Sequence, residues 1–146
     1  MADLDIRPAV PGDLEAVVNL LLAAGLPVKD LSGNLIEDFL VASTGSSLAG
    51  CIGLEVFSNT GLLRSLVVDP QFREAGLGRL LVAELEARAR RRGITALWLL
   101  TIDADRYFAR LGYSLEQRDR APEAIRRTAE FSLLCPGDAV LMKKTI

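Results

Sequence analysis

The run from Arg73 to Gly78 has the composition of a phosphate-binding turn. Arg73, Gly76 and Gly78 form the pattern Arg-x-x-Gly-x-Gly between an apolar, β-prone segment and an amphipathic one. A helix N-terminus presents unpaired backbone N–H groups and the positive end of the helix dipole. Glycines there let an anion approach the backbone, and an arginine offers a charged fork for phosphate oxygens. The alternative is a plain helix start that carries a solvated arginine.

The residues after this pattern exclude two common phosphate loops. A P-loop requires Gly-Lys-Ser/Thr, but Gly78 is followed by Arg79 and Leu80. A dinucleotide-binding loop requires a third glycine, and that position is Leu81. Following a strand that ends at Val68, the pattern resembles the coenzyme A pyrophosphate loop of the GNAT superfamily of N-acetyltransferases.

A second element downstream strengthens this resemblance. Residues 107–113 read Tyr-Phe-Ala-Arg-Leu-Gly-Tyr, directly after a short apolar strand. They resemble the family's aromatic-aromatic-x-x-x-Gly-aromatic element, a helix beside the coenzyme that ends at Gly112. Taken alone, the same residues would also suit an ordinary helix cap. Together with the loop, they extend the resemblance over residues 48–118.

The resemblance implies acetyl-CoA as co-substrate and assigns residues to it. In the family, a strand amide just before the loop commonly polarises the thioester carbonyl, which here falls among residues 66–68. The side chains of these residues are also suited to plain sheet core. The predicted coenzyme-binding residues are Leu66, Val67, Val68, Arg73, Glu74, Ala75, Gly76, Leu77, Gly78, Arg79 and Phe108.

The customary catalytic side chains of the family are missing. The resemblance would place the general base at Leu62 and the general acid at Phe108, and neither residue can transfer a proton. The chain has no histidine, the residue most often used for proton transfer near neutral pH. Tyr107 carries the nearest hydroxyl and is the predicted replacement acid. The alternative is that water and substrate handle the protons.

Two charged residues lie inside otherwise apolar strands. If the hairpin turns over Ser58–Gly61, Phe57 faces Leu62 and Glu55 faces Arg64, and directly opposed residues share one face of the sheet. We predict that Glu55 binds or deprotonates the amine and that Arg64 clamps a substrate carboxylate. The alternative is a cross-strand ion pair worth about 0.2–1 kcal/mol.

The C-terminal quarter suggests an acceptor class. Together with the Leu-Leu-Arg-Ser run at residues 62–65, residues 120–136 resemble a GNAT subgroup associated with bacterial arsenic resistance, the ArsN type. They also resemble, more distantly, amino-acid N-acetyltransferases such as N-acetylglutamate synthase. The implied acceptor is a small amino acid or an analogue, arsenicals included. Thr128 and Glu130 are predicted substrate-binding residues.

The order of elements predicts an α/β fold. We expect one GNAT domain over residues 1–146, with helices on both faces of a mixed, mostly antiparallel sheet of six to seven strands. Asp13 can cap the first helix, which ends at Ala24-Gly25. The expected strands are 5–9, 39–43, 47–57, 62–68, 96–101, 113–118 and 138–145. The expected helices are 14–24, a segment within 26–40 capped by Ser32 or Asn34, the helix after the glycine turn with apolar residues from Leu77 to Ala89 on one face, 105–111, and 122–128 with Pro122 at its first position.

The composition argues against several classes of binding partner. The chain has 146 residues and a net charge of −2, with no basic arm, so nucleic acid is not an expected partner. No apolar run approaches the ~20 residues needed to span a membrane, and no signal peptide is recognisable. Two cysteines, Cys51 and Cys135, predict neither a disulfide framework nor a metal site. We expect a cytoplasmic protein without a metal, and a homodimer is left open.

The sequence thus predicts an acetyl-CoA-dependent N-acetyltransferase that acts on the primary amine of a small molecule, an amino acid or amino-acid-like compound. Two alternatives remain. The acceptor could be a protein N-terminus or lysine, which an open acidic groove would favour. Alternatively, the chain could bind acetyl-CoA without turnover, as a regulatory protein.

Overall fold

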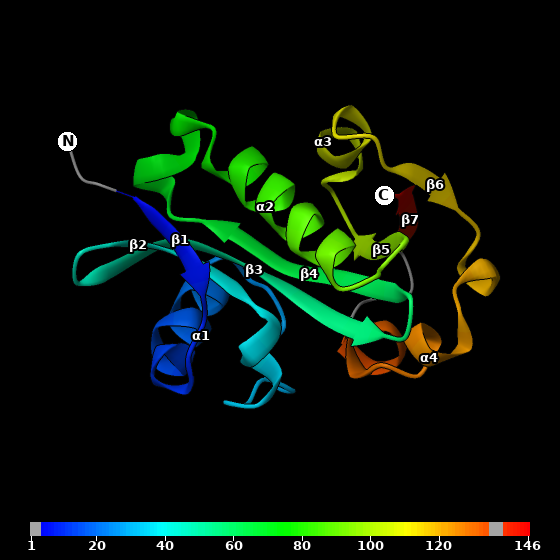
Figure 1. The fold of residues 1–146 in the computed structure, drawn as a ribbon, viewed down its shortest axis with the longest axis horizontal. Coiled ribbons are helices and arrows are strands. Elements are labelled where there is room, and N and C mark those ends of the chain that lie inside the picture. Colours follow the sequence, from blue (N-terminus) through cyan, green and yellow to red (C-terminus); the bar gives the residue numbers. More distant parts are fainter. Residues whose placement is uncertain (1–3, 135–138) are drawn as a thin grey trace.

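A mixed sheet forms the centre of the molecule, and the computed structural model describes residues 4–134 and 139–146, without the side chains at positions 74, 75, 133 and 134. The sheet has the order β1-β2-β3-β4-β5-β7-β6 (Figure 1). Only β4 and β5 pair in parallel, which confirms the predicted mixed, mostly antiparallel sheet. The strands are β1 (Asp5–Pro8), β2 (Leu40–Thr44), β3 (Ser47–Phe57), β4 (Thr60–Val68), β5 (Ala96–Thr101), β6 (Ser114–Glu116) and β7 (Val140–Thr145).

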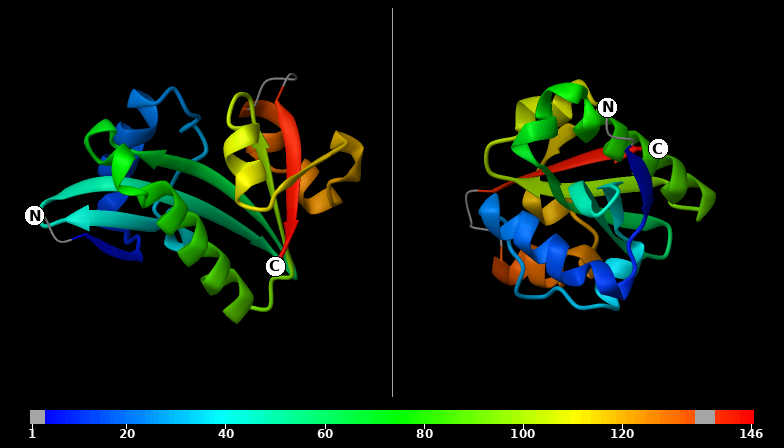
Figure 2. Two further views of the ribbon diagram at one scale, coloured as in Figure 1. Left: turned by 90° about the horizontal axis from the view of Figure 1, so that it is seen from above. Right: turned by 90° about the vertical axis from the view of Figure 1, so that its left-hand side faces the viewer.

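Helices cover both faces of the sheet, as predicted. The longest, α2 (Leu77–Arg91), lies with α3 (Asp105–Arg110) on one face, whereas α1 (Leu14–Ala23) and α4 (Glu123–Arg126) lie on the other (Figure 2). Short 3₁₀ turns connect these elements, and a π-helical turn follows α4. The turns are η1 (Pro11–Asp13), η2 (Leu35–Asp38), η3 (Pro70–Ala75), η4 (Arg118–Arg120) and the π turn η5 (Glu130–Leu134).

Each face has its own apolar core. On the α2 face, Leu77, Leu81 and Leu85 recur at helical spacing, are buried, and pack against strand residues such as Leu63. On the opposite face there are two separate clusters, one around α1 and one around α4. The strand residues between those two clusters include a charged one, Arg64, which is described below with the candidate site.

The predicted register of the central hairpin is wrong. Phe57 pairs with Thr60 and Glu55 with Leu62, so the turn contains only Ser58 and Asn59. Ser58 adopts a φ of +57°, the left-handed conformation that a two-residue turn between twisted strands requires. Glu55 therefore faces Leu62 directly and Arg64 diagonally. Because a shift of two residues preserves the side-chain alternation, Glu55 and Arg64 still share one face.

The predicted second helix within residues 26–40 is reduced to the four-residue turn η2. The Ser32 hydroxyl accepts a hydrogen bond from the Leu35 amide at 3.1 Å, in the manner of a cap. Upstream of the turn, the apolar side chains Leu26, Val28 and Leu31 pack under the α1 cluster. These side chains reach the core from an irregular backbone, so the segment before η2 packs without forming a continuous helix.

Two C-terminal elements are shorter than predicted. The strand expected over residues 113–118 is limited to β6, because Arg118 turns inward and donates to the Ala139 carbonyl at 2.8 Å. The helix expected over residues 122–128 is limited to α4, and Pro122 is extended, with a ψ of 148°, so it precedes the helix. Of the last predicted strand, Asp138 lies outside the described residues, as does Cys135.

Candidate active site

The candidate site lies where β4 and β5 diverge. Their parallel pairing is limited to Thr60–Leu62 with Ala96–Trp98, after which the two strands separate (Figure 2, left). Beyond Leu62, the edge of β4 that faces β5 has no strand partner among the described residues. Its backbone N–H and C=O groups are therefore open to a ligand.

A β-bulge marks this divergence. Ser65 and Leu66 together oppose the single residue Ile52 of β3, since the register changes between Gly53–Arg64 and Cys51–Val67. Ser65 has a φ of +58°, which is rare for a residue with a side chain. The buried Cys51 thiol donates to the Ser65 carbonyl at 3.4 Å. Burial raises the pKa of Cys51 to about 12, so the thiol keeps the proton that it donates.

One pocket on the open edge of β4 has the features of a phosphate site. Its cavity of about 350 Å³ lies against the N-terminus of α2 and is lined by Leu66, Val67, Val68, Arg73, Gly76, Gly78, Arg79 and Tyr107. Gly76 has a φ of +74°, which side-chain-bearing residues rarely adopt. A Cβ at Gly78 would lie 2.6 Å from the Tyr107 hydroxyl. We call this cavity the donor pocket.

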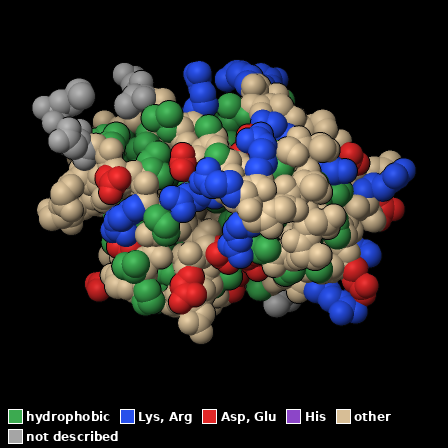
Figure 3. All heavy atoms as spheres, viewed as in Figure 1, with side chains coloured by type: hydrophobic (Ala, Val, Ile, Leu, Met, Phe, Trp, Pro, Cys, Tyr) green, Lys and Arg blue, Asp and Glu red, His purple; other side chains and the backbone are tan. Residues whose placement is uncertain are grey.

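Basic side chains dominate the surroundings of the donor pocket. Lys and Arg residues gather over the side of the molecule that carries α2 and α3 (Figure 3). Arg73 is fixed through its Nε, which donates to the Val68 carbonyl at 3.3 Å. A neighbouring hollow of about 370 Å³ is lined by Arg79, Tyr107, Arg110 and Leu111. The positive charges and open amides fit the pyrophosphate of coenzyme A.

Tyr107 projects from α3 beside this pocket. Its ring packs edge-on against Phe108, with centroids 5.3 Å apart. Burial raises the pKa of Tyr107, an effect opposed by the charge of Arg79, so the hydroxyl stays protonated at neutral pH. The helix ends in a Schellman motif as predicted, because Tyr113 N–H donates to the Phe108 carbonyl and Gly112 has a φ of +99°.

A second pocket meets the donor pocket at Leu66 and Tyr107. Its cavity of about 190 Å³ passes between the diverging strands and is bounded by the loop after α1. We call it the acceptor pocket. It is lined by Leu26, Pro27, Leu63, Arg64, Ser65, Leu66, Leu99, Leu100, Thr101, Asp103, Ala104, Tyr107, Phe108 and Glu130.

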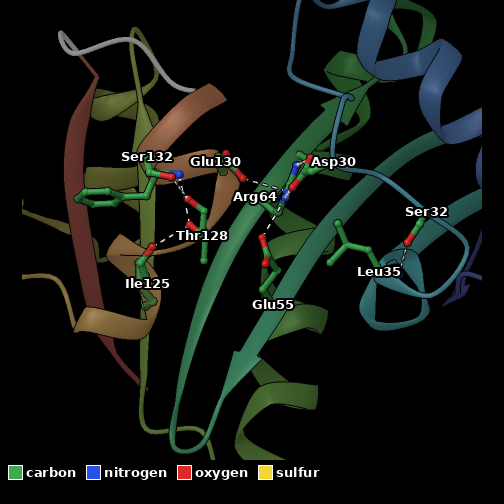
Figure 4. Close-up of polar contacts among 11 residues, drawn as sticks. Asp30, Ser32, Leu35, Glu55, Arg64, Ile125, Thr128, Glu130 and Ser132 are labelled. Atoms are coloured by element: carbon green, nitrogen blue, oxygen red, sulfur yellow. Dashed lines mark hydrogen bonds and ion pairs between the residues drawn. The ribbon is translucent and has the colours of Figure 1, made fainter.

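Arg64 is buried at the wall of the acceptor pocket among three carboxylates (Figure 4). Its Nη1 lies 2.5 Å from Asp30 Oδ2 and 2.9 Å from Glu55 Oε2, and its Nη2 lies 2.8 Å from Asp30 Oδ1. Its Nε lies 2.8 Å from Glu130 Oε2. Desolvation disfavours the guanidinium charge, but the bonds to Asp30 and Glu55 and the charge of Glu130 outweigh it and raise the pKa of Arg64. We call these four residues the Arg64 cluster.

Comparison with known proteins gives the family. Residues 25–113 match the acetyltransferase (GNAT) family. An uncharacterized N-acetyltransferase of Chlorobaculum tepidum is 30% identical over 99% of this chain and 98% of its own length. The chain belongs to the GNAT family. This confirms both the predicted resemblance and the predicted enzyme class, an acyltransferase.

Two other similar proteins are much longer than this chain. The amino-acid acetyltransferase of Neisseria meningitidis is 29% identical over 86% of this chain but only 31% of its own length. N-acetylglutamate synthase from Neisseria gonorrhoeae, solved with coenzyme A and N-acetylglutamate, matches with a TM-score of 0.85 and 25% identity, over 99% of this chain and 35% of that one. The chain thus spans about a third of these relatives. A Mycobacterium tuberculosis protein solved with CoA shares the fold over 97% of this chain and 99% of its own, with a TM-score of 0.80 and 22% identity.

The coenzyme-binding residues predicted from the GNAT resemblance lie mostly together. The donor pocket contains all of those predicted except Glu74, Ala75, Leu77 and Phe108. The Leu77 side chain is buried in the core, and Phe108 lines the acceptor pocket. The side chains of Glu74 and Ala75 lie outside the described part of the structure.

The predicted acceptor-side residues are divided. Glu130 and Arg64 line the acceptor pocket, whereas Glu55 and Thr128 do not. Glu55 contacts Arg64 from behind the pocket wall. The Thr128 hydroxyl is used within its own segment, where it donates to the Ile125 carbonyl at 2.7 Å and accepts from the Phe131 amide at 3.2 Å (Figure 4).

Sequence reasoning missed Asp30 and Asp103. Asp30 lies in an irregular loop, 34 residues before Arg64, so no periodic pattern connects the two. Asp103 lies just after the end of β5 at Thr101, and the end of a buried strand is the one signal that could have indicated it.

Within residues 4–134 and 139–146, no group of three His, Cys, Asp or Glu side chains could hold a metal ion. No helix in the same ranges is long and apolar enough to cross a membrane.

Proposed function

We propose that this protein transfers the acetyl group of acetyl-CoA to the primary amine of a small molecule, an amino acid or amino-acid-like compound. The observation that carries the proposal is the junction of the donor and acceptor pockets at Leu66 and Tyr107. Two reactants bound on either side of this junction would meet at one point, which is the main requirement of a transfer between them.

Acetyl-CoA as the donor is supported by the family and by the relatives solved with coenzyme A. Arg73, Arg79 and the amides at Gly76–Gly78 would hold the pyrophosphate. The open edge of β4 at residues 66–68 would hold the pantetheine arm and polarise the thioester carbonyl. When bound, the thioester supplies the activated acetyl group.

The reaction needs two proton transfers. The amine nitrogen attacks the thioester carbonyl carbon, the C–S bond breaks, and the sulfur leaves as a thiolate that takes up a proton. We assign Tyr107 as the donor of that proton, since its phenol is protonated and lines both pockets. The amine loses a proton in the same process, and we assign it to water, because Glu55, the predicted base, does not line the acceptor pocket and is paired with Arg64.

The small acceptor is supported by the size of the acceptor pocket, about 190 Å³, which suits a compound of amino-acid size better than a protein segment. The names of the relatives, amino-acid acetyltransferase and N-acetylglutamate synthase, point in the same direction. An arsenical analogue would fit the same class. We also propose that residues 1–146 act as one N-acetyltransferase domain.

A thiol-release screen tests this function. The protein and acetyl-CoA are incubated with amino acids, polyamines, aminoglycosides, amino-acid-like arsenicals and an N-terminal peptide, and free CoA thiol is measured. We expect release with small amines and none with the peptide. Stabilisation by acetyl-CoA without release for any amine would favour the non-catalytic alternative. No stabilisation by any CoA species would contradict the donor pocket itself.

A further inference from the structure

The charges around the acceptor pocket are unbalanced. The Arg64 cluster contains one guanidinium and three carboxylates, those of Asp30, Glu55 and Glu130. Of the cluster, Arg64 and Glu130 line the acceptor pocket. Asp103 adds a second carboxylate to the lining, and Arg64 is the only basic residue among those described as lining the pocket. The carboxylate side chains of the cluster are 8–18% exposed, so solvent and salt screen them only in part.

Arg64 has little capacity left for a substrate carboxylate. A guanidinium has five N–H donors, and a bidentate clamp needs two parallel ones. Both Nη1 hydrogens are directed to Asp30 and Glu55, one Nη2 hydrogen to Asp30, and the Nε hydrogen to Ser65 Oγ or Glu130. One N–H remains. An incoming carboxylate would have to displace Asp30 and would then lie among like charges.

The cluster also fixes the shape of the pocket. Asp30 belongs to the loop after α1, whose residues Leu26 and Pro27 line the acceptor pocket. Its two-point contact with Arg64 anchors this loop to β4, and Glu130 anchors the C-terminal segment to the same guanidinium (Figure 4). Arg64 thereby acts on the acceptor through the residues that it holds.

We propose that the acceptor carries a second positive charge, as a diamine or a basic amino acid does, and that Arg64 is a positioning residue. This inference rests on the proposed function and adds the charge of the substrate to it. Glu130 lines the pocket beside Arg64, so its negative charge would attract a substrate ammonium bound there. Asp103 adds attraction at the pocket wall and makes no ion pair with an arginine among the described residues.

Three amines of matched length test the charge preference. Cadaverine, pentylamine and 5-aminopentanoate each have five carbons and a primary amine, and the end away from that amine is cationic, neutral or anionic. We expect kcat/KM to fall in that order, by about fivefold to tenfold per step, between the values typical of exposed and buried charge pairs. We also expect a higher kcat/KM for lysine than for glutamate, and we expect the ratio of the two values to fall as salt is added.

Charge-removing variants connect the preference to the pocket. Asp103→Asn and Glu130→Gln should each lower the ratio of kcat/KM for cadaverine to kcat/KM for pentylamine about fivefold. Asp119→Asn, an exposed residue outside the pocket lining, is the matched control.

Arg64→Lys, which keeps the charge but loses the planar guanidinium, tests the positioning role. It should raise KM for cadaverine and pentylamine and leave kcat within about twofold. Thermal unfolding of each variant identifies any loss of fold.

The outcomes separate this inference from the proposed function. A higher kcat/KM for 5-aminopentanoate, or equal values for all three amines, would overturn the inference and leave the acetyltransferase intact. If none of the three is acetylated, the inference is tested on the broader screen. Faster acetylation of cationic than of acidic amines there would support it, and the reverse would overturn it. If no amine of any kind is acetylated, the proposed function fails first.

Discussion

At the scale of single residues, position in the pockets distinguishes functional candidates that look equivalent in the sequence. Glu55 and Arg64 stand out as charges in apolar strands, yet both are largely engaged in the Arg64 cluster. Tyr107 looks like one of two aromatic residues in a helix, yet it lies where the donor and acceptor pockets meet. Removing its hydroxyl is the sharpest test of the proposed chemistry.

Tyr107→Phe should lower kcat about a hundredfold, the lower range for loss of a general acid, with little change in thermal stability. A phenol donates its proton only below its pKa, and burial raises that of Tyr107 above the ordinary value of 10. In the wild type, kcat should therefore fall only above pH 10, and this decline should disappear in the variant. Steady-state thiol release against pH measures both effects.

Tyr113→Phe is the matched control. Tyr113 is buried and donates to Glu86 at 2.9 Å, away from both pockets. Its variant should lose about 1 kcal/mol of unfolding free energy and keep its kcat. Unchanged kcat in Tyr107→Phe would instead indicate that water protonates the leaving thiolate.

At the scale of elements, the donor pocket depends on backbone geometry more than on side chains. The bulge at Ser65 and Leu66 and the left-handed Gly76 before α2 together shape the open amides. Neither feature depends on which apolar side chains fill the core beneath it. Substitution of Gly76 therefore tests the pocket without altering its charges.

Gly76→Val should abolish binding of acetyl-CoA, because a β-branched residue disfavours a φ of +74° and places a side chain in the pocket. At an acetyl-CoA concentration of 100 times the Kd, the wild type should gain about 2.7 kcal/mol of stability, and the variant none. Differential scanning fluorimetry with and without acetyl-CoA measures this difference.

Gly45→Val controls for backbone strain, since Gly45 has a φ of +64° in a hairpin turn with nothing within 4 Å of its Cβ position. Each of the two glycine variants should lose about 1–2 kcal/mol of unfolding free energy, approximately the cost of a strained backbone position. Gly45→Val should nevertheless still be stabilised by acetyl-CoA. Retained acetyl-CoA affinity in Gly76→Val would contradict the assignment of the donor pocket.

At the scale of the whole molecule, the Arg64 cluster joins segments that are distant in sequence. The loop after α1, the central hairpin and the segment after α4 each contribute a carboxylate to the same guanidinium. The two apolar clusters on this face of the sheet are separate, and Arg64 lies on the strand between them. Its charge should therefore matter for the stability of the fold as well as for the acceptor.

Arg64→Met should lower the free energy of unfolding by about 3–5 kcal/mol at pH 7, the cost of leaving buried charges without their partner. Arg127→Met is the control, because Arg127 pairs with Glu123 on the surface and should contribute less than about 1 kcal/mol. Urea denaturation measures both. A loss in Arg64→Met no larger than in the control would mean that the three carboxylates tolerate one another.

The sequence by itself determined the family, the glycine turn at Gly76, the long helix after it and the cap at Gly112. These features depend on residues close together in the chain, where helix dipoles, glycine conformations and periodic apolar patterns act locally. The bounds of β3 and β5 were predictable for the same reason, since each strand is an apolar run between turns.

Only the tertiary structure decided the hairpin register, the irregular path of residues 26–34 and the surroundings of Arg64. Asp30 and Glu130 lie 34 and 66 residues from Arg64, and nothing local signals that one guanidinium gathers both. The sequence suggested an arginine for a substrate carboxylate or, alternatively, an ion pair with Glu55, and the structure contains that pair. The fold brings it three carboxylates first, because a buried charge must be compensated by whichever partners the packing of distant segments supplies.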